Sequence, residues 1–77
     1  MDQAKQKLVD GLLQSVLDRI KTEAVVIEHV QIGALTDDEK KEIGDYLLQK
    51  VEAAGFGDDP LIGYGSTGRL GLGLKKF

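Results

Sequence analysis

The residue pattern that most clearly suggests a chemical role lies at positions 63–68, Gly-Tyr-Gly-Ser-Thr-Gly. Its G-x-G-x-x-G spacing is that of loops whose glycines let a backbone approach a phosphate closely. In a dinucleotide-binding fold such a loop leads into a helix, and an acidic residue follows about twenty positions later. Residues 69–77 carry no acid and alternate leucine with glycine, which is not helical. We therefore interpret positions 63–68 as a hairpin turn, with a phosphate contact as the alternative.

Residues 62–70, Ile-Gly-Tyr-Gly-Ser-Thr-Gly-Arg-Leu, resemble the glycine-rich loop of protein kinases. In that family the loop is a hairpin above the nucleotide phosphates, and a lysine follows it, which Lys75 or Lys76 could mimic. The resemblance ends with these residues. Because no catalytic loop or metal-binding aspartate follows in the 77 residues, we do not expect kinase activity.

Other catalytic groups are few. The chain has one histidine, His29, and two serines, Ser15 and Ser66, so a serine–histidine nucleophile is improbable. The carboxylates at 37–39 and 58–59 lack the alternating spacing of a calcium loop and fit helix-capping and turn roles. We expect no enzymatic activity, no metal and no cofactor.

Three basic residues, Arg69, Lys75 and Lys76, lie near the aromatic residues Tyr64 and Phe77. Three cations make at most three phosphate contacts, which predicts weak and salt-sensitive binding. Nucleic-acid binding is therefore unlikely. The alternative function that we keep open is a small phosphate-ligand or nucleic-acid binder that uses the turn at 63–68 with these three cations.

Size and composition describe a small globular protein. The 77 residues predict one domain, with 42% hydrophobic and 30% charged residues and a net charge of −3. The chain has no cysteine, no signal-peptide pattern and no apolar run that could span a bilayer, so we expect a cytoplasmic protein without membrane contact. A domain this small gains little from its own core, which favours contact with a second subunit or a partner.

Apolar residues recur at helical spacing through residues 3–22 and predict a helix there. They spread over about 180° of the circumference, wider than the ~100° stripe that one packing surface needs. The helix is therefore predicted to offer apolar surface to a second copy, and Gly11 is a candidate for a close helix approach. The residues of this expected self-contact are Leu8, Leu12, Leu13, Val16, Leu17 and Ile20.

Four further segments follow. Residues 24–32 are rich in β-branched residues and predict a strand. Thr36 and Glu39 form a capping box that starts a helix at Asp37, and Gly55 ends it. Its expected buried stripe is Ile43, Leu47, Val51 and Ala54. Residues 61–65 and 69–77 flank the three-residue loop 66–68 and predict a hairpin.

The hairpin register places Tyr64 opposite Leu70 and Gly63 opposite Gly71, so one face is apolar and the other nearly bare backbone. Together the segments predict an α+β fold of order α-β-α-β-β, with a small three-stranded, mostly antiparallel sheet and two helices on one face. The strand order stays open.

These observations favour a non-enzymatic protein–protein interaction module, an accessory or regulatory factor that pairs with itself as a homodimer through the first helix. We expect the C-terminal hairpin to bind another protein, with strand 69–77 offering a free edge to a partner's strand. The hairpin candidates are Gly63, Tyr64, Gly65, Arg69, Gly71, Gly73, Lys75, Lys76 and Phe77.

Overall fold

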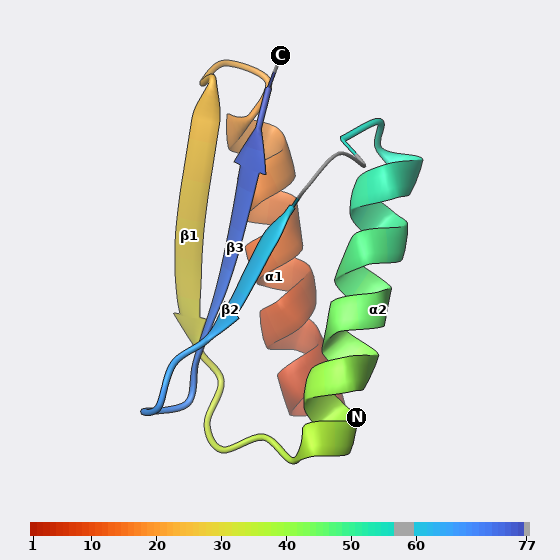
Figure 1. Ribbon diagram of the computed structural model, residues 1–77, viewed down its shortest axis with the longest axis vertical. Coiled ribbons are helices and arrows are strands. Elements are labelled where there is room, and N and C mark those ends of the chain that lie inside the picture. The colour runs from red at the N-terminus through yellow and green to blue at the C-terminus, as the bar shows by residue number, and fades with distance from the viewer. Residues whose placement is uncertain (57–59, 77) are drawn as a thin grey trace.

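The computed structural model describes residues 1–56 and 60–76 and shows an α+β arrangement of two helices and a three-stranded sheet. Along the chain the elements are α1 (Gln3–Arg19), β1 (Val25–Gln31), α2 (Asp37–Ala53), β2 (Leu61–Tyr64) and β3 (Arg69–Lys75). The strand order is β1-β3-β2, and both pairings are antiparallel. Both helices lie on the same side of the sheet (Figure 1). The predicted fold class is confirmed.

The helix ends follow from local hydrogen bonds. Asp2 caps α1 by accepting from the Lys5 amide at 2.8 Å. In α2 the predicted capping box is present: Thr36 Oγ1 accepts from the Glu39 amide at 3.1 Å, and Glu39 Oε1 accepts from the Thr36 amide at 3.0 Å. Gly55 follows α2 with a φ of 91°, the left-handed conformation predicted for the residue that stops the helix.

Two predicted helix details need correction. The first helix ends at Arg19 and not at residue 22, because the Thr22 amide bonds to the carbonyl three residues back, at Arg19, in a turn tighter than that of an α-helix. Ala54 is exposed and not part of the buried stripe of α2, since it is the C-cap residue beyond the last core side chain, Val51.

The core lies between the sheet and the two helices. The central strand β3 contributes Leu70, Leu72 and Leu74, whose exposed fractions are at most 3%. Alternate residues of β1 face the same core. The other core residues are Val9, Leu12, Leu13, Val16, Ile20, Val26, Ile32, Ile43, Leu47 and Val51.

The hairpin forms in the predicted register. Tyr64 pairs with Leu70, and Gly63 pairs with Gly71. Gly68 ends the loop with a φ of 81°, as expected for a glycine that closes a bulged three-residue turn. The Gly68 carbonyl also accepts hydrogen bonds from the amides of Ile32 and Gly33, which ties the turn to the end of β1.

The strand order overturns one expectation. We expected the last strand to offer a free edge, but β3 is hydrogen-bonded on both sides and has none. The edges of the sheet belong to β1 and β2. A partner strand therefore has no main-chain groups of β3 to pair with.

The excess apolar surface expected on the first helix is also absent. Leu12, Leu13, Val16 and Ile20 are buried in the core, and Leu17 is partly buried against it. Leu8 alone among the six predicted self-contact residues is exposed, at 37%. The wide apolar arc is needed because α1 packs on the sheet and also contacts α2.

Candidate functional site

The candidate site is the face of the sheet that carries no helix, which we call the open face. Side chains alternate along each strand, so the residues that do not enter the core point to this face. From β1 these are Val25, Ile27, His29 and Gln31; from β3, Arg69, Gly71, Gly73 and Lys75; and from β2, Leu61 and Gly63.

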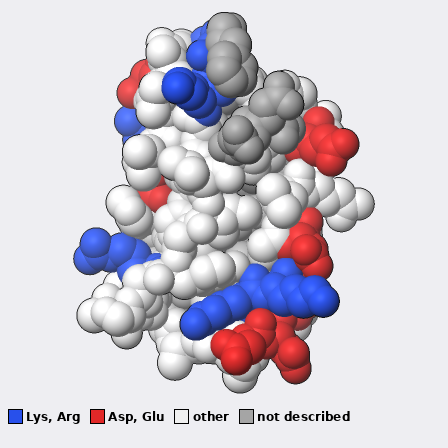
Figure 2. All heavy atoms as spheres, in the orientation of Figure 1, with Lys and Arg blue, Asp and Glu red and all other residues white. Residues whose placement is uncertain are grey.

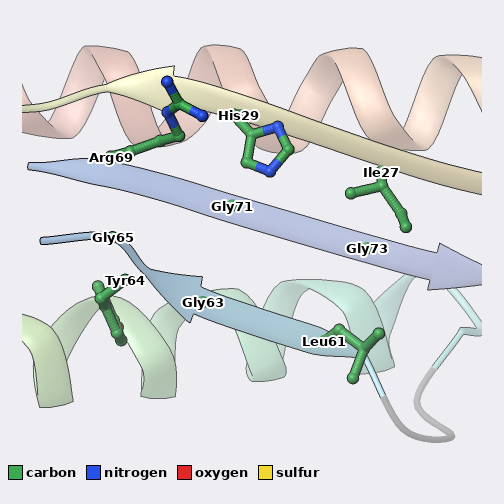
Figure 3. A pocket seen from close by; sticks show the side chains of 9 residues that line it. All are labelled: Ile27, His29, Leu61, Gly63, Tyr64, Gly65, Arg69, Gly71 and Gly73. Atoms are coloured by element: carbon green, nitrogen blue, oxygen red, sulfur yellow. The ribbon is translucent and has the colours of Figure 1, made fainter. Parts of the chain in front are cut away.

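A groove of about 340 Å³ runs over the central strand on this face. Gly71, Gly73 and Gly63 lie along it, and Figure 3 shows Ile27, His29 and Leu61 around them. These flanking residues include strongly exposed apolar side chains: Ile27 is 57% exposed and Leu61 is 68% exposed. The missing side chains of the glycines therefore create a hollow with apolar sides.

The glycines of β3 leave room for the side chains of β1. A Cβ at Gly71 would lie 3.0 Å from His29 Cδ2, and a Cβ at Gly73 would lie 3.3 Å from Ile27 Cγ1. Both distances are tighter than ordinary carbon contacts. Gly63 differs, because a Cβ there meets nothing within 4 Å. The groove can thus be filled from position 63 without disturbing the fold.

The open face is electrostatically one-sided. Arg69 and Lys75 point to it from the two ends of β3, and none of its described residues is acidic. The chain as a whole has 13 acidic and 10 basic residues. Figure 2 shows acidic side chains along α2, whereas the surface over the strands is mainly uncharged. The acid on β1, Glu28, points inward, where it accepts from Ser15 Oγ at 2.6 Å and pairs with Arg19 at 3.3 Å.

Many of the residues that line this groove were among the hairpin residues predicted from the sequence. Residues of the predicted hairpin that line it are Gly63, Tyr64, Gly65, Arg69, Gly71 and Gly73. Lys75 is exposed at the far end of β3, and Phe77 lies outside the described residues. The sequence interpretation missed Ile27, His29 and Leu61. The β1 residues could have been found from the alternation in residues 24–32, had the pairing of that strand with β3 been known.

The predicted basic cluster does not form as a unit. Arg69 and Lys75 lie at opposite ends of β3, and Lys76 Nζ donates to the Lys21 carbonyl at 3.2 Å. Tyr64 is turned toward α2, where its hydroxyl donates to the Lys40 carbonyl at 2.5 Å. Burial, followed by the negative charge of Asp45, raises the pKa of Tyr64. Its ring is therefore not placed to stack on a base at the open face.

The turn at 63–68 has a structural role of its own. A Cβ on Gly68 would lie only 2.7 Å from the backbone carbon of Gly33. Gly68 is thus required for a close approach of two chain segments as well as for its left-handed conformation.

The remaining catalytic candidates stay apart. Ser15 donates its hydroxyl to Glu28, while His29 lies on the open face, so the described residues contain no serine–histidine hydrogen bond. In residues 1–56 and 60–76, no three histidine or carboxylate side chains are grouped to hold a metal ion. The carboxylates at 37–39 form the first turn of α2, as predicted, and those at 58–59 lie outside the described residues.

No helix in the described part of the chain is long and apolar enough to cross a membrane. Comparisons of the chain with protein-family models, with curated proteins and with solved structures give no match.

Proposed function

We propose that this chain is a non-enzymatic interaction module that binds another protein through its open face. The observation that carries the proposal is the glycine-floored groove, flanked by exposed Ile27 and Leu61. Large exposed apolar side chains around a hollow are typical of protein-binding surfaces. Glycines in a central strand weaken the strand and are often kept where another group approaches the backbone closely.

The charges of the open face indicate the kind of partner. Arg69 lines the groove at one end, Lys75 lies at the opposite end of β3, and acidic side chains are absent among the described residues of the open face. A matching partner offers an apolar side chain to the glycines and carboxylates to the two cations. A second copy placed face to face on this one would instead bring like charges together.

The size of the open face predicts a transient complex. Three strands at ~4.8 Å spacing and seven residues at ~3.3 Å rise span on the order of 300 Å². A stable protein interface buries ~800 Å² on each partner. We therefore expect weak binding, or a partner that also contacts other parts of the molecule.

The test compares two variants that add the same charge. Gly63→Glu fills the groove and places a carboxylate between its sides, and Gln49→Glu adds a carboxylate to an exposed site on α2. Wild type and both variants are immobilised, and proteins captured from an extract of the source cells are quantified by mass spectrometry. Circular dichroism and thermal unfolding establish that both variants are folded.

We expect at least one protein that wild type and Gly63→Glu capture to different extents, with Gln49→Glu behaving as wild type. Its direct binding to the purified chain is then measured by titration, with the same order of affinities. Capture of the same proteins in equal amounts by all three chains, or of none by wild type, would contradict the proposal.

The phosphate or nucleic-acid alternative keeps one supporting observation, the excess of cations on the open face. The separation of Arg69 from Lys75 and the inward turn of Tyr64 weaken it. Fluorescence anisotropy with a single-stranded oligonucleotide at low salt decides between the two. Binding that is lost in Arg69→Ala would favour the alternative.

A further inference from the structure

The two edges of the sheet differ in length and composition. β2 has four residues, follows Pro60 and contains Gly63. β1 has seven residues and contains neither proline nor glycine. Short strands and prolines protect an edge from pairing with other chains. By these criteria β1 is the edge that is open to another strand.

The hydrogen bonds of β1 alternate between its two sides. The Ala24 carbonyl accepts from the Lys76 amide, and the Ile32 amide donates to the Gly68 carbonyl, so even-numbered residues face β3. In an antiparallel pair the intervening residues point their N–H and C=O groups the other way. Val25, Ile27, His29 and Gln31 therefore present main-chain donors and acceptors at the free edge, since β1 pairs with β3 alone among the described residues.

A second groove, of about 240 Å³, lies between this edge and α1. On the helix side it is lined by Leu8, Gly11, Leu12 and Ser15, with Lys7 beside them, and on the strand side by residues 28–30. Leu8 is 37% exposed, and a Cβ on Gly11 would meet nothing within 4 Å. Figure 3 shows α1 running behind β1, so the helix backs the edge.

From these features we infer that the edge of β1 binds one extended segment of a partner protein, which adds to the sheet as a fourth strand beside α1. The segment's backbone pairs with the outward groups of Ile27 and His29, as in strand-addition complexes. Its alternate side chains enter the groove against Leu8 and Leu12. These side chains are apolar, because Leu8 and Leu12 line the groove and its carboxylate, Glu28, is already paired with Ser15 and Arg19. Lys7, at the rim of the groove, disfavours a cationic side chain there.

A second copy fits this edge less well than a lone segment. Two β1 strands paired about a two-fold axis would lie ~4.8 Å apart, and each carries its own α1 on the same side of the sheet. The second α1 would then compete with a partner's side chains for the groove beside β1. A single extended segment brings no helix and avoids this conflict. The site is distinct from the open face, although a bound strand would lengthen that face beyond β1.

The test selects binders from a phage-displayed library of random ten-residue peptides, with the full chain as target. The selected peptide is titrated against four variants. His29→Pro removes one outward N–H and leaves the even-numbered hydrogen bonds to β3 in place, and His29→Ala keeps that N–H. Gly11→Leu fills the groove on α1, and Gln49→Leu adds the same side chain to the exposed surface of α2.

We expect Gly11→Leu to weaken peptide binding at least ~10-fold relative to Gln49→Leu, and His29→Pro to weaken it at least ~10-fold relative to His29→Ala, which keeps the N–H. Amide hydrogen exchange at Ile27 and His29, fast in the free chain, slows in the complex. The inference is overturned if no peptide is selected, if selected peptides bind all four variants equally, or if exchange at these two amides is unchanged. Gly63→Glu is not expected to affect this binding, so this test and that of the open face can fail independently.

Discussion

Individual glycines in this chain have different structural roles, which depend on the residues that lie next to them. Gly71 and Gly73 let His29 and Ile27 lie over the central strand, and Gly68 lets the hairpin turn touch Gly33. The sequence predicted Gly68 as a turn residue from the three-residue loop and its glycine in third place. It could not predict the contact with Gly33, because that contact joins segments far apart in the chain.

Substitutions at two of these positions should therefore have opposite outcomes. Gly68→Ala puts a Cβ 2.7 Å from the Gly33 backbone at a φ of 81°, and we expect it to lower the free energy of unfolding by about 2–4 kcal/mol. Gly63→Ala adds a methyl group to open space and should be neutral or slightly stabilising. Urea unfolding monitored by circular dichroism measures both. Equal effects of the two changes would show that the close approach at Gly68 is not rigid.

A second residue-scale prediction concerns Glu39. The hydrogen bond from Lys5, at 2.9 Å, and then that from the Thr36 amide lower the pKa of Glu39 below its ordinary value. Since the ionised form is favoured in the folded state, this stabilisation is complete at neutral pH and is lost as the pH falls through the folded-state pKa. Carbon-detected NMR titration of the carboxyl should give a lower midpoint in wild type than in Lys5→Met. An unchanged midpoint in Lys5→Met would contradict the role given to Lys5.

At the scale of elements, the sequence predicted the type and the ends of each helix and strand better than it predicted how these elements lie next to one another. The capping box at Thr36 predicted the start of α2, and the hairpin loop predicted the register of β2 on β3. The position of β3 between β1 and β2 was not predictable, because either edge of the hairpin could accept the first strand. The free edge was therefore assigned to the wrong strand, and Ile27 and His29 were missed as neighbours of the glycines.

The cap itself can be tested by its effect on α2. Thr36→Ala removes the oxygen that accepts from the Glu39 amide, and we expect a loss of about 1 kcal/mol in unfolding free energy. Thr36→Ser keeps a hydroxyl at the same place and should restore most of that loss. Urea unfolding of the three chains provides the comparison, and equal stability of all three would contradict a capping role.

At the scale of the whole molecule, the breadth of the apolar stripe on α1 predicts a surface for a second copy. The structure uses this stripe inside one chain, because α1 has to cover the sheet and meet α2 as well. In a molecule of 77 residues the two situations give the same sequence pattern. The spacing of apolar residues shows how much of a helix surface is buried. It does not show whether the same chain or a second copy buries it.

A charge at the centre of α1 distinguishes the two situations. Val16 is fully buried, so Val16→Asp should cost several kcal/mol and unfold the chain. Leu8→Asp places the same group at the exposed end of the stripe and should leave the fold intact. Circular dichroism and sedimentation across a hundredfold range of concentration measure both. If wild type dimerises and the Val16→Asp chain is folded and monomeric, the hypothesis of self-association through α1 would be supported again.

The central place of β3 also has a consequence for how the chain acquires its structure. Every strand pairing involves β3, and one of them joins Val25 to Lys75. During synthesis, β1 and β2 have no strand partner until β3 leaves the ribosome. Helix α1 emerges before β3, with its apolar stripe uncovered over that interval. We therefore expect the sheet to form only after β3 has emerged, with the nascent chain dependent on chaperones or on rapid collapse to protect α1.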